Sequence, residues 1–293
     1  MQIEKLSECT ICHSAQFEVL DEGCNITRCA GCGYIFDNPR PAAAELVRFY
    51  SNSGEYDGWL QDLAIRDRMW KRRLRIVKST GKTGSLLDVG TGIGQFLDIA
   101  RPFYSEVYGT EVSSTAVAIA REKYGLSIFE GTLEELKQQA LQFDNISMFH
   151  VLEHVPDPRQ SLATCHALLS DGGILMIAVP NEIASLRGFL KRILRRMGFR
   201  THQPGKLGIP LIRLDGSIGE IHLSHFTPGV LRALLERSGF SVIKSTLDPY
   251  YLRRSGWPGL KKDLYYYGCL ALHALFRVNL FDAMLLIAKK RNG

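Results

Sequence analysis

Four cysteines near the start of the chain form two pairs whose spacing is typical of a metal site. Two residues separate the cysteines within each pair and sixteen separate the pairs; the four are Cys9, Cys12, Cys29 and Cys32. Zn²⁺ prefers four ligands in a tetrahedron, and each C-x-x-C turn supplies two thiolates. The spacing therefore predicts a structural Zn²⁺, with two disulfides or a redox pair as competing interpretations. Such a site has no open coordination position, so we assign it no catalysis.

The segment FHVLEHVPDP is the second candidate for chemistry. Its His150, Glu153 and His154 fit the H-x-x-E-H pattern of a class of zinc peptidases. That chemistry needs a continuous helix, which directs all three side chains at one ion. Here an apolar, strand-like run precedes His150, and two prolines, which disrupt helices, follow within the segment. The segment is therefore predicted to be a loop after a strand rather than a peptidase site.

The elements around this loop follow a regular alternation. From residue 85 onward, short apolar runs alternate with helical segments, which predicts parallel β-α-β units with right-handed crossovers. The last two strands are expected to form an antiparallel edge hairpin that completes the sheet. The expected strands are 85–89, 106–111, 126–131, 143–152, 172–181, 240–247 and 281–290. Residues 60–79 are expected to form an amphipathic helix before the first strand.

A glycine turn follows the first of these strands. Gly90, Gly92 and Gly94 have the spacing G-x-G-x-G, whereas a nicotinamide-dependent dehydrogenase would need G-x-G-x-x-G. Asp88 precedes the turn, and Glu111 ends the second strand, where an acidic side chain can hold ribose hydroxyls. Ligands bind beyond the carboxyl ends of strands in such sheets, so the combination predicts a site for an adenosine-containing cofactor.

Residues 85–180 resemble the core of the class I S-adenosylmethionine-dependent methyltransferases. The motif LDVGTGIGQF, the acidic end of the second strand and the SDGG turn before the fifth carry this resemblance. The segments HVLEHVPDP and HLSHFTPGVLRALLERSGF are similar to a subgroup found in glycan and natural-product pathways, in which a four-cysteine zinc module recurs. The resemblance implies an α/β fold, with a Rossmann-like seven-stranded methyltransferase sheet and a small zinc ribbon-like module.

The same resemblance implies which residues bind S-adenosylmethionine. Glu111 would bind the ribose, the glycine turn would face the methionine part, and the segment after the third strand would lie beside the adenine. The cofactor-binding residues expected on this basis are Asp88, Gly90, Thr91, Gly92, Gly94, Glu111, Val112, Gly131, Thr132, Leu133 and His150.

Methyl transfer to a hydroxyl acceptor needs a base with a pKa near neutrality, which histidine provides. The candidates are His150, His154, His222 and His225, of which His154 and His225 are predicted to be catalytic. The alternative interpretation is that these histidines line the cofactor cleft or fix loops through hydrogen bonds to the backbone.

Three regions are expected along the chain: a zinc ribbon-like module at 1–41, a helical linker at 42–84 and the methyltransferase domain at 85–293. The resemblance weakens at 181–221 and 248–280, which are therefore interpreted as insertions in this domain.

The formal net charge of +6 is concentrated in the first insertion, so it gives little support to nucleic-acid binding. Residues 183–200 are expected to form a helix with one apolar face and basic residues on the others. It is interpreted as a surface helix, as a lid that recognises phosphate on a substrate, or as an interfacial helix against anionic lipid. The resemblance favours a small-molecule or lipid-linked glycan acceptor, methylated on oxygen or carbon. Nothing in the sequence indicates the oligomeric state.

The first residues, MQIEKLSECT, lack the pattern of a secretory signal, and the apolar stretch at 264–276 is shorter than the roughly 20 residues that span a bilayer. A cytoplasmic enzyme, or one peripheral to the inner face of the membrane, is therefore expected. The alternative function is a non-catalytic protein with a methyltransferase fold that binds the cofactor or a zinc-mediated partner.

Overall fold

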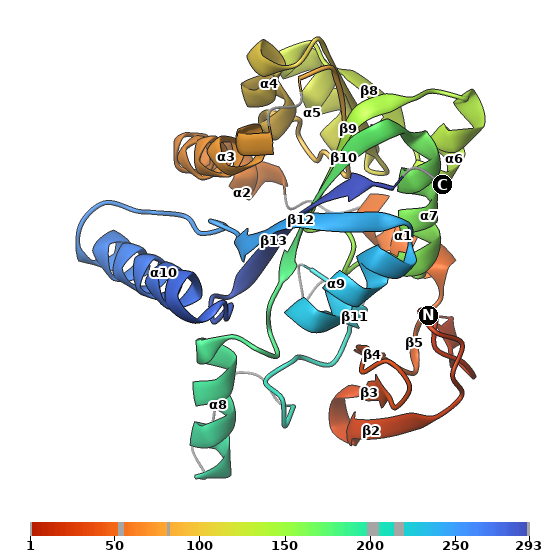
Figure 1. Ribbon diagram of the computed structural model, residues 1–293, viewed down its shortest axis with the longest axis vertical. Coiled ribbons are helices and arrows are strands. Elements are labelled where there is room, and N and C mark those ends of the chain that lie inside the picture. Colours follow the sequence, from red (N-terminus) through yellow and green to blue (C-terminus); the bar gives the residue numbers. More distant parts are fainter. Residues whose placement is uncertain (1, 52–55, 81–82, 198–204, 214–219, 292–293) are drawn as a thin grey trace.

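The computed structural model describes the whole chain except residues 1, 52–55, 81–82, 198–204, 214–219 and 292–293. In the described part, seven strands form one sheet in the order β12-β13-β10-β9-β6-β7-β8 (Figure 1). The strands are β6 (Ser85–Val89), β7 (Glu106–Glu111), β8 (Ser127–Glu130), β9 (Phe143–Phe149), β10 (Leu169–Pro180), β12 (Phe240–Leu247) and β13 (Ala283–Lys290).

Strand β13 is antiparallel to both of its neighbours, β10 and β12, and the other pairs are parallel. The α/β sheet predicted from the sequence, including its final antiparallel pair, is confirmed. From β6 the chain runs outward through β7 to β8 and then returns to β9 on the other side of β6. The reversal of direction therefore lies between β6 and β9, where open α/β sheets bind their ligands.

Alternate side chains of the strands point to opposite faces of the sheet, and each face is covered by its own helices. Ile174, Met176 and Ala178 of β10 lie in a core with α3, α4 and α5, whereas the intervening residues lie in a core with α6, α7 and α9. These helices are α3 (Leu63–Val77), α4 (Gln95–Ala100), α5 (Ser114–Tyr124), α6 (Leu133–Leu136), α7 (Pro158–Leu168) and α9 (Pro228–Arg237). Short 3-10 turns follow α3, α4 and α6 at Lys78–Thr80, Arg101–Phe103 and Lys137–Gln139.

The N-terminal region packs on the second of these faces. Tyr34 and Phe36 lie in the same core cluster as Phe226, and the Tyr34 ring contacts the rings of both phenylalanines. The strands are β1 (Ile3–Glu4), β2 (Phe17–Asp21), β3 (Ile26–Cys29), β4 (Ile35–Asp37) and β5 (Arg40–Pro41), with a 3-10 turn at Glu22–Cys24. A distant strand, β11 (Ser224–His225), pairs with β4 and extends this small sheet to the order β11-β4-β3-β2. The predicted boundary at residue 41 stays a prediction.

Between the small sheet and β6 lie α1 (Ala43–Ser51), α2 (Tyr56–Gln61) and α3. The predicted helix at 60–79 corresponds mainly to α3, which packs against α4. The two predicted insertions contain α8 (Leu186–Arg196) and α10 (Trp257–Phe276). The part of the expected helix at 183–200 that follows residue 197 lies outside the described residues. None of the helices in the described part of the chain combines the length and the apolar character needed to cross a bilayer.

Candidate functional site

The glycine turn after β6 has a backbone that other residues would not readily adopt. Gly90, Gly92 and Gly94 have φ angles of 64°, 55° and 80°. A Cβ atom on Gly92 would lie 2.7 Å from the ring of Trp59, and one on Gly90 would lie 2.6 Å from a methyl group of Val151. Glycine is therefore required here both for the left-handed backbone and for the close approach of neighbouring groups.

Glu111, at the end of β7, connects this turn to the next loop. Its Oε2 accepts a hydrogen bond from the backbone N–H of Gly92 at 2.8 Å. Its Oε1 accepts from the N–H groups of Val112 at 2.8 Å and Ser113 at 2.9 Å. An ionised carboxylate has about four acceptor positions, so these three bonds leave one for a ligand hydroxyl. Burial raises the pKa of Glu111, and the three amide donors oppose this effect.

Most of the other residues expected at the cofactor site lie at or just after the ends of β6, β7 and β8. Asp88 is buried beneath the turn, where its Oδ1 accepts a hydrogen bond from the Ser147 hydroxyl at 2.5 Å and burial raises its pKa to about 7. The N–H of Gly131 donates to the carbonyl of Glu111 at 2.9 Å. Thr132 forms a capping box with Glu135 at the start of α6, whose first residue is the buried Leu133. Thr91, within the turn, is also buried. The structure thus brings the expected cofactor residues of these three loops together.

Trp59 of α2 is a neighbour of the turn that the sequence did not reveal. Its ring lies against Gly92, and the Arg66 guanidinium stacks 4.1 Å from its centroid. The ring thus holds a cation in place, because cations are attracted to aromatic faces. A tryptophan in an otherwise polar segment could have identified Trp59 as a candidate, but the sequence contained no indication of where α2 packs.

His150 begins the loop after β9, as predicted, with a left-handed φ of 58°. Its ring stacks on Tyr250 at 3.9 Å between centroids, and its Nε2 lies 3.0 Å from Oδ2 of Asp248. Asp248 also accepts a hydrogen bond from Nε of Arg73 at 2.8 Å, and both side chains of this ion pair are fully buried. The pair was not predicted. The loop continues to Asp157, whose side chain caps α7. In this described segment no helix runs through His150 and His154, so the peptidase interpretation is excluded.

His154 and His222 lie close to each other and to Glu153. The rings of the two histidines are 5.0 Å apart between centroids, and the Glu153 side chain is 1% exposed. Nδ1 of His154 lies 2.6 Å from the carbonyl oxygen of Ile221. Burial lowers the pKa of His154, so its imidazole is neutral near pH 7.

His225 is held between two carboxylates. Its Nδ1 lies 2.7 Å from Glu182 and its Nε2 lies 2.9 Å from Asp37. Burial alone would lower the pKa of His225, but the bonds to Asp37 and Glu182 raise it to about 9. Both nitrogens of the imidazolium therefore donate, and neither is free to accept a proton. The assignment of His225 as a base stays a prediction, which this geometry does not favour.

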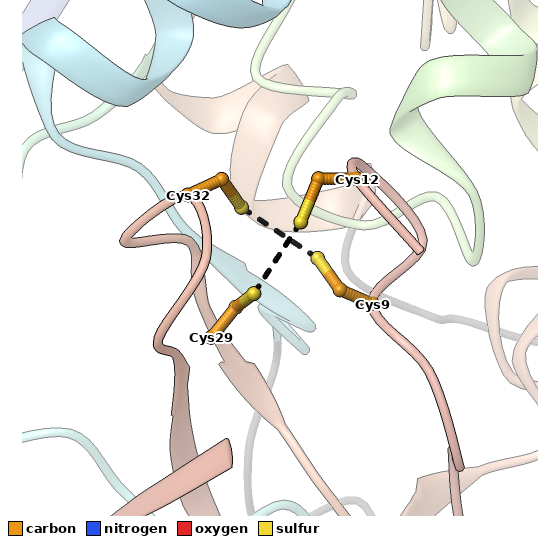
Figure 2. Close-up of side chains that lie close together, drawn as sticks. All are labelled: Cys9, Cys12, Cys29 and Cys32. Carbon is orange, nitrogen blue, oxygen red and sulfur yellow. Dashed lines mark hydrogen bonds between the residues drawn. The ribbon is translucent and has the colours of Figure 1, made fainter. Parts of the chain in front are cut away.

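The four N-terminal cysteines converge on one point (Figure 2). Their sulfur atoms lie within 4.8 Å of one another, with Sγ separations of 3.7 Å for Cys9 and Cys32 and 3.5 Å for Cys12 and Cys29. Zn–S bonds of about 2.3 Å in a tetrahedron place the sulfurs about 3.8 Å apart, so the four residues fit the ion. A disulfide needs about 2.05 Å, and none is formed by these cysteines.

A family model described as a methyltransferase domain matches residues 60–245 of the chain. A relative from Mycolicibacterium smegmatis, named a probable S-adenosylmethionine-dependent methyltransferase, is 26% identical over 192 residues, which cover 63% of this chain and 64% of the relative. A Mycobacterium tuberculosis protein of the same description is 28% identical, over 70% of this chain and 66% of its own length. The chain thus spans slightly less than two thirds of the length of these relatives. A ubiquinone biosynthesis O-methyltransferase from Chelativorans is 31% identical over 43% of this chain and 53% of its own length.

Solved methyltransferases share the fold. An S-adenosylmethionine-dependent methyltransferase from Thermotoga maritima aligns with a TM-score of 0.52 and 17% identity, over 84% of this chain and 100% of its own. Magnesium protoporphyrin IX methyltransferase from Synechocystis, solved with bound S-adenosylmethionine, aligns with a TM-score of 0.50 and 14% identity, over 86% of this chain and 99% of its own. At these identities the likeness concerns the fold alone.

Proposed function

The chain belongs to the methyltransferase-domain family whose model matches residues 60–245, and from this premise we propose that it is an S-adenosylmethionine-dependent methyltransferase. The observation that carries the proposal is the hydrogen bond between the Glu111 carboxylate and the N–H of Gly92. It places an acidic side chain and a glycine turn together at the carboxyl ends of β6 and β7. This is the arrangement that an adenosine-containing ligand requires.

In the proposed complex, the remaining acceptor position of Glu111 binds a ribose hydroxyl, and the backbone of Gly90 to Gly94 faces the methionine part. Residues 131–133 lie beside the adenine. The bound cofactor supplies the activated methyl carbon, so the chain has to orient the acceptor and handle its proton. Thr91 contributes a buried hydroxyl within the turn, next to the Asp88 carboxyl.

The proposed acceptor is a hydroxyl of a sugar or glycan. The name of the Chelativorans relative, an O-methyltransferase, supports oxygen as the methylated atom. His154 is proposed to receive the acceptor proton, because its imidazole is neutral and lies in the loop after β9, four positions beyond His150. His225 is proposed to hold the small sheet against this loop.

The cysteine cluster is proposed to bind a structural Zn²⁺. Its support is the match between the sulfur separations and a tetrahedral thiolate site. The sulfurs all face the centre of the cluster, so the ion would stabilise the small sheet rather than take part in methyl transfer.

The surface of α8 and α10 is proposed to bring the enzyme to anionic lipid, where a lipid-linked acceptor would be found. Phe189 and Met197 of this region are 53% and 66% exposed, and basic side chains lie on the same helix. Arg187 connects the two helices: it pairs with Asp282 at 2.8 Å and stacks on Tyr265 of α10. Exposed apolar and basic side chains on one helix suit an anionic membrane surface.

Calorimetric titration with S-adenosylmethionine tests the proposal. We expect Glu111→Ala to weaken binding by about 1–3 kcal/mol, or about 5- to 150-fold in Kd, because charge-assisted hydrogen bonds are lost. Glu106→Ala is the matched control, since Glu106 lies exposed at the opposite end of the same strand. Unchanged affinity in Glu111→Ala would mean that the ribose is held elsewhere. Absence of binding by the unaltered protein would favour the non-catalytic alternative.

A further inference from the structure

Glu153, His154 and His222 form a cluster to which the cofactor gives no role. Each offers one ligand atom, and these atoms lie within 4.8 Å of one another. The backbone holds the two contributing segments together, because the N–H groups of Leu223 and Ser224 donate to the carbonyl oxygen of Glu153 at 2.8 and 3.1 Å. Two of the three residues belong to the loop after β9, which borders the proposed active site.

The buried Glu153 carboxylate has only long contacts with its neighbours. Burial raises its pKa, but His150, His154 and His222 together lower it. Its side chain is 1% exposed, and neither oxygen accepts a hydrogen bond from any described residue. Nδ1 of His150 lies 3.4 Å from Oε1 of Glu153, and Nε2 of His154 lies 3.8 Å from the same oxygen. Buried polar groups are normally paired, and an unpaired buried charge is costly. A cation placed against this carboxylate would remove that cost.

The hydrogen bonds of the two histidines define which nitrogen atoms are available. Nδ1 of His154 lies 2.6 Å from a carbonyl oxygen, which can only accept, so Nδ1 carries the hydrogen. Nδ1 of His222 lies 3.1 Å from Oε1 of Glu182 and donates in the same way. In His154, whose pKa is lowered by burial, the lone pair is then on Nε2. Burial would also lower the pKa of His222, but Glu182 and Glu220 raise it well above its usual value, so a metal ion has to displace the proton on Nε2 of His222. Nε2 of His222 forms an ion pair with Glu220 at 3.6 Å, a separation longer than an ordinary hydrogen bond.

This pattern is the one that metal-bound histidines show: the second ring nitrogen donates to a carboxylate or a backbone carbonyl, which fixes the ring and its tautomer. We propose that Glu153, His154 and His222 bind a divalent first-row metal ion, such as Mn²⁺, Fe²⁺ or Zn²⁺. Two imidazoles and one carboxylate are a typical ligand set for these ions, and they leave coordination positions open.

The role of the ion rests on the function proposed above. In a six-coordinate ion such as Mn²⁺ or Fe²⁺, three protein ligands leave room for two neighbouring hydroxyls, so the acceptor class that fits is a vicinal diol, as in a sugar. A bound divalent ion lowers the pKa of a coordinated hydroxyl. The hydroxyl proton then passes to solvent, the oxygen forms the new bond to the methyl carbon, and the carbon–sulfur bond of the cofactor breaks, leaving a neutral thioether. His154 would then be a ligand, in place of the base proposed above.

The test is a titration of the full chain with Mn²⁺. Binding is measured by electron paramagnetic resonance, as the decrease in the signal of free Mn²⁺. Mn²⁺ is chosen because the thiolate cluster prefers softer ions. The unaltered protein should bind one Mn²⁺ per chain. His154→Asn and His222→Asn should each weaken binding at least about tenfold. Asparagine can still donate to Ile221 or Glu182 but has no atom in place of Nε2. His166→Asn, on α7 outside the cluster, should bind like the unaltered protein.

If the unaltered protein does not bind Mn²⁺, the inference is overturned without any variant. It is also overturned if both asparagine variants bind Mn²⁺ as tightly as the unaltered protein does. If either asparagine variant does not fold, Glu153→Gln is used in its place, because it keeps the shape of the side chain. S-adenosylmethionine is titrated into the same samples. Cofactor binding without Mn²⁺ binding rejects the metal site and leaves the proposed function standing. Mn²⁺ binding without cofactor binding rejects the proposed function and leaves the metal site standing.

Discussion

Nε2 of His225 lies 2.9 Å from Oδ2 of Asp37, although 188 positions separate the two residues. Asp37 ends β4 of the N-terminal sheet, and His225 ends β11, which pairs with β4. The other nitrogen of His225 contacts Glu182, which also contacts His222. A continuous set of charged hydrogen bonds therefore connects the cysteine-bearing region to the histidines beside the proposed active site.

The first prediction concerns stability at alkaline pH. The pKa of His225 is raised to about 9 in the folded protein, above the ordinary value of about 6.5. The stabilisation is therefore complete below about pH 6.5 and is lost as the pH rises through about 9. We expect the free energy of unfolding to fall by about 1–3 kcal/mol between pH 7 and 9.5, measured by urea denaturation with Zn²⁺ present.

Asp37 acts in the opposite sense at lower pH, which is why the measurement begins at pH 7. Burial raises the pKa of Asp37 to about 6, so its ionisation destabilises the fold between about pH 4 and 6. In Asp37→Asn, His225 keeps only the Glu182 carboxylate, so the decline should be smaller and begin at a lower pH. A free energy of unfolding that stays constant from pH 7 to 9.5 in the unaltered protein would contradict this account.

The second prediction concerns the cysteine cluster. Cys12→Ser should lower the zinc content by one ion per chain and the melting temperature with it, because a structural zinc contributes directly to folding free energy. Cys9 and Cys29 lie in the same core as Tyr34 and Phe36, so the loss should reach the large sheet. Cys24→Ala is the control: Cys24 is buried in the same region but lies outside the cluster. Equal zinc content in the two variants, by mass spectrometry, would exclude the cluster as the site.

Local sequence patterns predicted the sheet, the glycine turn after β6 and the loop after β9. Glycine spacing and the acidic end of a strand are short-range signals, and the fold brings Gly92 and Glu111 together as expected. The sequence pattern also placed His150 in a loop, because an apolar run and two prolines surround it.

Contacts between distant segments had no such signal. Arg73 and Asp248 form a fully buried ion pair across 175 positions, and neither residue differs locally from an exposed charge on a helix or loop. In the same way, His222 was recognised as a candidate base, but its approach to Glu153 depends on the pairing of Leu223 and Ser224 with the loop after β9. Tertiary packing, which no local pattern encodes, decides both.

The third prediction concerns the surface of α8. We expect the unaltered protein to sediment with phosphatidylcholine vesicles that contain phosphatidylglycerol, and not with pure phosphatidylcholine vesicles. Lys191→Glu combined with Arg196→Glu should weaken this binding about tenfold or more, since each basic residue near an anionic surface contributes about 1 kcal/mol. Both residues are exposed on α8, which Figure 1 shows projecting away from the large sheet.

The matched control changes the net charge equally at a different place. Lys123→Glu combined with Lys137→Glu alters two exposed lysines, one on α5 and one in the 3-10 turn after α6. If vesicle binding depended only on net charge, both double variants would lose it to the same extent. Retention by the control and loss by the α8 variant would locate the lipid contact on this helix. Full retention by the α8 variant would leave α8 as a solvated surface helix.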